Sequence, residues 1–143
     1  MKIRDILATK GSDVHAIGVD NTVLDAVAWL VELRIGALLV READGGVAGI
    51  ISERDVLREC RHRSAELART RVGEVMTRNL VVCGGDDDID HVMGVMTTKR
   101  IRHLPVMDGD RVAGMVSIGD LVKATIEQTD YENRFLKEYI SAR

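Results

Sequence analysis

The chain has 143 residues, of which 45% are hydrophobic and 30% charged, and its formal net charge is -3. A chain of this size buries one moderate hydrophobic core, which an internal duplication could divide into two similar halves. The acidic balance argues against nucleic acid as a partner, and no apolar run reaches the ~20 residues of a membrane span. The N-terminus lacks the apolar core of a signal peptide, so a cytoplasmic protein is expected.

The two cysteines, Cys60 and Cys83, stand apart from each other and from any histidine pair. This spacing fits neither a zinc site nor a disulfide framework, so buried or incidental thiols are favoured. The acidic run from Gly84 to Asp88 lacks the spaced oxygen ligands of a calcium loop, and helix capping is the better interpretation. We therefore expect no metal and no cofactor.

In the first half of the chain, hydrophobic period and turn residues predict alternating strands and helices. Asp20, Asn21 and Thr22 offer capping oxygens before an apolar helical face. The Asp44-Gly45-Gly46 turn between two short apolar runs is typical of a β-hairpin. The predicted elements are a strand over 14–18, a helix from Val23 to near Gly36, strands over 37–40 and 47–51, and a helix from Ser52.

The second half predicts the same order of elements. These are a strand over 80–83, a helix over 89–99, strands over 104–107 and 112–116 joined by a turn over 108–110, and a helix from Ser117. The two halves align residue by residue, for example Gly18 with Gly84, Asp20 with Asp86, Arg34 with Arg100, Gly49 with Gly114 and Asp55 with Asp120. Two copies of one unit account for most of the chain.

A last helix is predicted beyond the second copy, because no Pro or Gly interrupts the sequence from Leu121 to Ile140. Its apolar residues follow helical spacing and form a stripe. They are Tyr131, Phe135, Leu136, Tyr139 and Ile140. The stripe could fold back on its own repeat, but packing against a second copy of the chain is preferred, which predicts a homodimer.

The aligned Ser52 and Ser117 each begin a helix, and Asp55 and Asp120 follow one turn later on the same face. A hydroxyl at a helix start lies where free backbone N–H groups and the helix dipole favour phosphate. A carboxylate there can accept hydrogen bonds from both hydroxyls of a ribose. The alternative is that the serines are simple N-caps and the aspartates only favour the dipole.

Both segments, Gly49–Asp55 and Gly114–Asp120, fit the pattern Gly, two apolar residues, Thr or Ser, two variable residues, Asp. In this the chain resembles cystathionine-β-synthase-type (CBS) repeats, and 3–8 and 72–77 resemble the linker that precedes each repeat. The resemblance covers roughly residues 1 to 126. It implies an α+β (mixed α/β) fold of two β-α-β-β-α repeats, over 1–65 and 66–126, packed with pseudo-two-fold symmetry as one compact domain. A C-terminal helical extension over 127–143 follows.

The resemblance further implies two ligand clefts, each built from the Ser–Asp element of one repeat and strand residues of the other. One cleft would combine Ser52, Arg54 and Asp55 with Leu80, Val81, Ile101, Arg102, His103 and Pro105. The other would combine Ser117, Gly119 and Asp120 with Val14, His15, Ile35, Gly36 and Ala37.

The two implied clefts differ in charge. Arg102 and His103 offer donors to phosphate, whereas the equivalent Gly36 and Ala37 carry no charge. We therefore favour the Arg102 cleft for a phosphorylated ligand; the alternative is that Arg102 and His103 meet only solvent.

The function implied by the resemblance is a regulatory sensor that binds AMP, ADP, ATP or another adenosyl ligand and signals to a regulated protein partner. The alternatives are a ligand-free dimerisation scaffold for a partner protein and, less favoured, an enzyme that acts on a nucleotide. No catalytic motif for nucleophilic, metal or phosphoryl chemistry is present, so we do not expect an enzyme.

Overall fold

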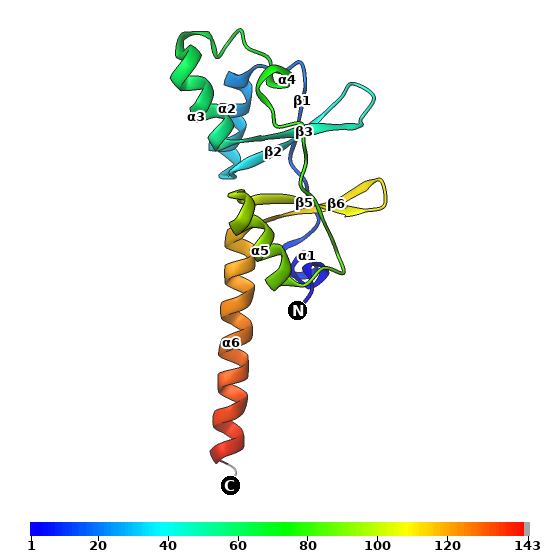
Figure 1. The fold of residues 1–143 in the computed structure, drawn as a ribbon, viewed down its shortest axis with the longest axis vertical. Coiled ribbons are helices and arrows are strands. Elements are labelled where there is room, and N and C mark those ends of the chain that lie inside the picture. Colours follow the sequence, from blue (N-terminus) through cyan, green and yellow to red (C-terminus); the bar gives the residue numbers. More distant parts are fainter. Residues whose placement is uncertain (142–143) are drawn as a thin grey trace. The chain divides into compact units, whose positions relative to one another are not determined.

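The computed structural model describes residues 1–141 and divides them into two compact units. The first-repeat unit is Asp13–Val81, and the second-repeat unit combines Met1–Ser12 with the chain from Val82 onward. Each unit contains helices and a three-stranded sheet, which confirms the mixed α+β class (Figure 1). Within residues 1–141, no helix is both long and apolar enough to cross a membrane.

The first-repeat unit is built around strand β2, which lies parallel to β1 and antiparallel to β3. Its elements are β1 (Ala16–Gly18), α2 (Val23–Leu33), β2 (Ala37–Arg41), β3 (Val47–Ser52), α3 (Glu53–Arg63), η1 (Ser64–Glu66) and α4 (Val72–Val75). Apolar residues of both helices and all three strands meet in one core, which includes Leu30, Leu38, Val40, Ile51 and Val56. Burial of these side chains holds the helices against the sheet.

The second-repeat unit repeats this topology, with β5 between β4 and β6. Its elements are α1 (Ile3–Lys10), β4 (Cys83–Gly84), α5 (Ile89–Lys99), β5 (His103–Asp108), β6 (Arg111–Ser117) and α6 (Ile118–Ser141). Even the irregularities are duplicated, because the ladder register shifts after Val40 in one sheet and after Val106 in the other.

The predicted elements exist, but several of their boundaries were wrong. The first strand begins at Ala16 rather than residue 14, and residues 80–82 lie outside β4. Helix α2 ends at Leu33, before the predicted end near Gly36, because Arg34 adopts the left-handed conformation (φ 55) that closes the helix. Arg100 does the same after α5, also with φ 55.

Each linker docks against the repeat that it does not precede in the chain. Ile3 at the start of α1 donates its backbone N–H to the oxygen of Asp87 (3.0 Å), in the second repeat. The equivalent Val72 donates to the oxygen of Asn21 (2.7 Å), in the first repeat. The segment before the first repeat therefore belongs to the second-repeat unit, and the segment between the repeats belongs to the first.

The predicted C-terminal helix is present as far as Ser141, and it is a direct continuation of the second repeat. Helix α6 runs without a break from Ile118, so the last helix of the repeat and the extension are one element (Figure 1). Residues 142 and 143 of the predicted extension lie outside the described residues.

Candidate functional site

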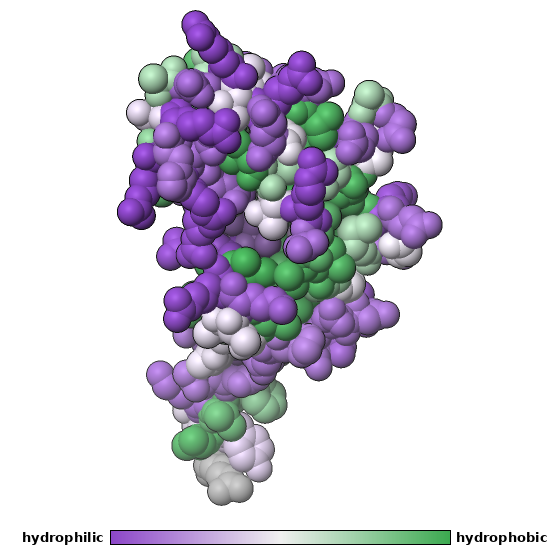
Figure 2. Space-filling view, turned by 45° about the horizontal axis from the view of Figure 1, so that its top comes forward, coloured by the Kyte–Doolittle hydropathy of each residue, from purple (hydrophilic) through white to green (hydrophobic). Residues whose placement is uncertain are grey.

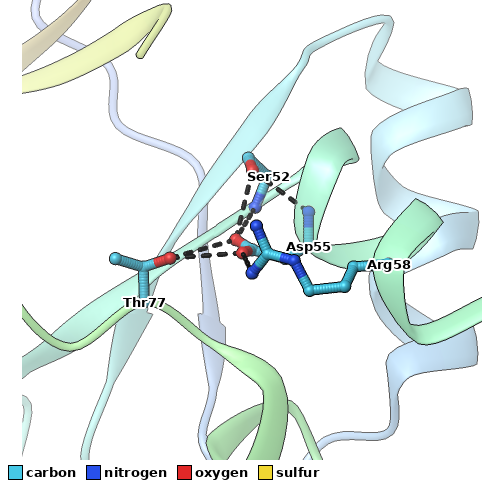
Figure 3. A network of polar contacts seen from close by, with 4 residues as sticks. All are labelled: Ser52, Asp55, Arg58 and Thr77. Atoms are coloured by element: carbon cyan, nitrogen blue, oxygen red, sulfur yellow. Dashed lines mark hydrogen bonds and ion pairs between the residues drawn. The ribbon is translucent and has the colours of Figure 1, made fainter. Parts of the chain in front are cut away.

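The Ser52–Asp55 element forms a reciprocal cap at the start of α3 (Figure 3). Ser52 ends β3 in extended conformation and is the N-cap residue, so its hydroxyl accepts from the backbone N–H of Asp55 (3.4 Å). In return, Asp55 Oδ2 accepts from the backbone N–H of Ser52 (2.9 Å) and from its hydroxyl (3.1 Å). The predicted capping role is therefore real, and the carboxylate is held in a fixed position.

Asp55 is one of the few buried charged residues, with 4% of its surface exposed. The hydroxyl of Thr77, just after α4, donates to both carboxylate oxygens, at 3.2 and 3.4 Å. The Arg58 guanidinium lies one turn further along α3, 3.6 Å from Oδ1, and is mostly exposed. Figure 3 shows these groups converging on the carboxylate from α3 and from the linker.

The equivalent Ser117–Asp120 element repeats the cap but has a different neighbour. Asp120 Oδ2 accepts from the backbone N–H of Ser117 (2.8 Å), and the Asp120 N–H donates to the Ser117 hydroxyl (3.2 Å). The ammonium group of Lys10, at the end of α1, lies 2.6 Å from the same Oδ2 and also donates to the Met115 carbonyl at 2.8 Å. Asp120 thus accepts a short hydrogen bond from an ammonium group, whereas Asp55 accepts from the Thr77 hydroxyl and has its cation, Arg58, further away at 3.6 Å.

Burial opposes ionisation of Asp120, but the hydrogen bonds from Lys10 and from the Ser117 N–H outweigh it, so the pKa of this carboxyl lies below its usual range. The side chain is 24% exposed, whereas that of Asp55 is 5% exposed. The two copies therefore present their carboxylates differently, and Asp120 is the more accessible of the two.

Capping alone does not distinguish Asp55 from other residues of the fold. Thr22 and Asp25 form the same reciprocal cap at the start of α2, with bonds of 3.0 and 3.1 Å. What sets Asp55 apart from Asp25 is its burial and the contact with Thr77 from another element. Asp55 therefore lies at a junction of elements, whereas Asp25 lies at a helix end.

Each unit also brings strand residues next to its own Ser–Asp element. The Glu53 N–H donates to the oxygen of Gly36 (3.0 Å), and Ala37 pairs with Ser52 in the sheet. In the second-repeat unit, the Ile118 N–H donates to the oxygen of Arg102 (2.8 Å). His103 pairs with Ser117 there. The residues at the starts of β2 and β5 were predicted to line a cleft. In the structure each set lies next to the first residues of a helix of its own repeat.

The remaining predicted site residues fall into the two units. The first-repeat unit holds Val14, His15, Ile35, Gly36, Ala37, Ser52, Arg54, Asp55, Leu80 and Val81. The second-repeat unit holds Ile101, Arg102, His103, Pro105, Ser117, Gly119 and Asp120. Each predicted cleft draws on both units, so its assembly stays a prediction.

Three residues of these clusters were not predicted from the sequence: Thr77, Arg58 and Lys10. Thr77 aligns with Ala8 of the other linker, but the segments 3–8 and 72–77 differ at every position, so the alignment alone does not single it out. Arg58 follows Asp55 by one helical turn, a spacing that brings side chains together. Lys10 reaches Asp120 across most of the chain's length, and no local pattern signals such a contact.

The prediction of buried or incidental thiols agrees with the structure, in which Cys83 is buried and Cys60 half-buried. Burial, with a smaller contribution from Asp87, raises the pKa of the Cys83 thiol to about 11. A thiol with so high a pKa carries almost no thiolate at neutral pH and is a poor nucleophile.

The duplicated strand-helix unit with its paired Ser–Asp caps defines a class of small regulatory domain, and comparison with known families identifies it. The family model described as CBS domain matches residues 3–62 and again 72–127. The chain belongs to the CBS domain family and carries a tandem pair of these domains. CBS pairs of this type are regulatory modules.

Relatives and solved structures agree with this assignment. The mitochondrial CBS domain-containing protein CBSX3 of Arabidopsis thaliana is 35% identical, over 96% of this chain and 71% of its own. The crystal structure of ATU1752 from Agrobacterium tumefaciens has a TM-score of 0.85 and 39% identity, covering 87% of this chain and 99% of its own. The CBS pair of MJ0100, in complex with 5′-methylthioadenosine and S-adenosyl-L-methionine, has a TM-score of 0.75 and 25% identity, covering 90% and 98%.

Proposed function

We propose that this protein is a regulatory module that binds an adenosyl ligand, such as AMP, ADP or ATP, and does not catalyse a reaction. The observation that carries the proposal is the duplicated Ser–Asp element, in which a carboxylate is held in a fixed position at the positive end of a helix dipole. Binding of methylthioadenosine and S-adenosylmethionine by the related MJ0100 pair supports the adenosyl class of ligand.

A phosphorylated ligand is favoured because basic side chains accompany both elements. Arg58 lies beside Asp55, and Lys10 lies beside Asp120. Arg102 is exposed just before β5, where a guanidinium fork can take two phosphate oxygens. We assign it, as part of the predicted Asp55 cleft, to the phosphate end of the ligand.

A thermal-shift screen of AMP, ADP, ATP, NAD and S-adenosylmethionine tests the proposal, because a ligand that binds the native state raises its stability by RT ln(1 + [L]/Kd). A saturable rise in melting temperature with at least one of these compounds is expected. The ligand should be recovered intact after incubation, whereas turnover would show an enzyme instead.

The variant Asp55→Asn tests the residue that carries the proposal. It keeps the size of the side chain but removes the charge that strengthens hydrogen bonds from ribose hydroxyls, so affinity should fall by ~1.5–3 kcal/mol. Asp25→Asn is the matched control, since Asp25 holds the same place in the cap of α2. Calorimetry should show the loss for Asp55→Asn alone, and equal affinities in both variants would remove Asp55 from the site.

The alternative function is a ligand-free dimerisation scaffold, which the exposed apolar stripe of α6 favours. The two functions are compatible, and the working assembly we propose is a homodimer that presents the ligand state to a partner protein. A cytoplasmic location is likewise proposed; the relative CBSX3 is described as mitochondrial.

A further inference from the structure

The arginines of the chain are concentrated in α3 and the segment that follows it, within the first-repeat unit. Residues 53–71 hold six of the fifteen arginines of the chain and no lysine. The same stretch contains four acids, so its formal charge is +2, although the whole chain carries -3. The remaining 124 residues therefore carry -5. The positive charge is a local feature on an acidic background.

Burial separates the two signs of charge further. Two of the four acids, Asp55 and Glu59, are buried, whereas all six arginines are exposed. The exposed acids are Glu53, the first residue of α3, and Glu66, which lies beyond its end. Figure 2 shows hydrophilic side chains gathered on the part of the first-repeat unit where α3 lies in Figure 1. The surface between the two exposed acids is therefore strongly basic.

Four exposed residues of α3 repeat at helical spacing and form its solvent face. They are Arg54, Leu57, Arg58 and Arg61, which together are called the α3 basic face. Asp55 and Glu59 lie on the opposite, buried side of the helix, so no acid interrupts this face. Leu57 is 69% exposed, although its neighbours on the face are all arginines. The face thus combines one open apolar side chain with three guanidinium groups.

The stability of the helix explains only part of this arrangement. Arg61 lies in the last turn, where a positive charge stabilises the helix dipole. Arg54 lies in the first turn, where a positive charge is unfavourable, and Arg58 follows it at a spacing at which like charges repel. Among residues 1–141, Arg61 has no acid within ion-pair distance. Folding alone does not account for the row of arginines, and binding of an anionic partner does.

We propose that the α3 basic face binds an acidic segment of a partner protein, in which carboxylates lie on both sides of an apolar side chain. A guanidinium group matches a carboxylate with two parallel hydrogen bonds, which an ammonium group cannot do, and arginine is enriched at protein interfaces. Leu57 supplies the apolar contact at the centre. From Arg54 to Arg61 the face is roughly 10 Å long, so two turns of a partner helix suffice to cover it.

The charge distribution favours a short acidic segment over an extended polyanion. Nucleic acid and an anionic membrane both present many charges over a wide area, and the acidic remainder of the chain repels them. Residues 53–71 also contain no Phe, Tyr or Trp to stack on bases. A single exposed leucine is too little to enter a bilayer. A protein segment that contacts α3 alone avoids the repulsion.

The α3 basic face shares its helix with the carboxylate assigned to the ligand. The Arg58 guanidinium lies 3.6 Å from Asp55 Oδ1, and Figure 3 shows the two side chains side by side. A ligand that reaches Asp55 therefore changes the surroundings of a residue that contacts the partner. This coupling rests on the proposed function, whereas binding of the acidic segment does not need a nucleotide.

Fluorescence anisotropy of a short labelled peptide, with glutamates on both sides of a central leucine, tests the proposal on the full chain without nucleotide. Saturable binding that weakens as the salt concentration rises is expected. Arg61→Glu should raise the dissociation constant about 10-fold, because repulsion replaces an exposed ion pair. Arg134→Glu, on α6, is the matched control with the same change of charge and should bind as the wild type does. Leu57→Ser should also weaken binding, which attraction between net charges alone would not produce.

Three results would overturn the proposal: no binding of the peptide, equal affinities for Arg61→Glu and Arg134→Glu, or tighter binding of a DNA duplex or of anionic lipid vesicles than of the peptide. A peptide with glutamine in place of each glutamate should not bind. The thermal shift that a nucleotide produces should be the same in Arg61→Glu as in the wild type, so failure of nucleotide binding is seen separately. Far-ultraviolet circular dichroism confirms that each variant is folded.

Discussion

Replacing the motif glycine of each repeat by alanine should have unequal effects, although the two glycines are equivalent in sequence. A Cβ atom on Gly49 would lie 2.4 Å from the carbonyl oxygen of Thr77 and 3.1 Å from Met76 Sδ. The first contact is with backbone that is itself fixed, because Ile50 and Thr77 exchange two hydrogen bonds of 3.0 and 2.8 Å. The linker cannot move away without breaking them.

At Gly114 the same Cβ would meet a side chain instead. The nearest atom is Leu7 Cδ2 at 2.7 Å, followed by Leu7 Cδ1 at 3.0 Å. These methyl groups end a flexible side chain that can change rotamer at small cost. Gly114→Ala should therefore be accommodated locally, with α1 still docked.

The magnitude for Gly49→Ala follows from two ways of relieving the overlap. Keeping the linker in place costs about 1–3 kcal/mol of overpacking strain. Releasing it costs two hydrogen bonds of about 0.5–1.5 kcal/mol each. Either cost is offset by up to ~1 kcal/mol, because alanine loses less backbone entropy than glycine on folding. Subtracting the offset leaves a range of about 0–3 kcal/mol, and we expect a net destabilisation near its middle, about 1–2 kcal/mol, against less than ~1 kcal/mol for Gly114→Ala.

Urea unfolding monitored by circular dichroism measures both variants under the same conditions. The expected result is a lower midpoint for Gly49→Ala than for Gly114→Ala, with little change in the slope. If the unfolding free energy of Gly49→Ala stays within ~0.5 kcal/mol of wild type, or if both variants lose the same stability, the contact with the linker is not the reason for glycine at position 49.

Two further predictions concern charge. Because the folded-state pKa of Asp120 is lowered, ionised Asp120 adds stability above its unfolded pKa of ~3.9, and this is lost as the pH falls through the folded value. Lys10→Met should remove about 0.5–1 kcal/mol at pH 7, after allowance for solvent screening, and move acid unfolding to higher pH. Lys2→Met removes an ion pair with Asp88 (2.7 Å) before the start of α1 and should have a smaller effect, because that pair is more exposed to solvent; identical pH profiles for the two variants would contradict this ranking. Arg102→Ala should weaken binding of ATP more than binding of adenosine. Equal losses of affinity for the two compounds, measured by calorimetry, would show that Arg102 does not contact the phosphates.

Much of the fold was predictable because the chain is duplicated and its turn residues are local signals. The helix over 89–99 was predicted with its observed bounds, since Asp88 precedes it and an apolar face defines it. Helix α2 ended early because Arg34 adopts a conformation that glycine or asparagine usually supplies. The strand predicted over 80–83 shrank to Cys83–Gly84, because hydrophobicity alone does not reveal which residues find a strand to pair with.

Only the contacts of the site between residues close together in the sequence could be predicted. Ser52 and Asp55 could be paired because one helical turn separates them, and the structure joins them by hydrogen bonds. The contacts with Thr77 and Lys10 depend on which linker packs against which repeat. That choice follows from tertiary packing, and no periodic pattern in the sequence encodes it.

Each linker packs against the repeat that it does not precede in the chain. The residue that contacts each Ser–Asp carboxylate from a linker therefore comes from outside the sequence copy that carries the carboxylate. Asp55 belongs to the first copy, yet its hydroxyl neighbour Thr77 precedes the second; Asp120 belongs to the second copy, yet Lys10 precedes the first. A change in either linker therefore alters the carboxylate of the other copy. With Ala8 at the position equivalent to Thr77, the chain cannot form both contacts alike, so the two copies of the Ser–Asp element are chemically distinct. Divergence of two short linkers is thus enough to give the two carboxylates different hydrogen-bond partners.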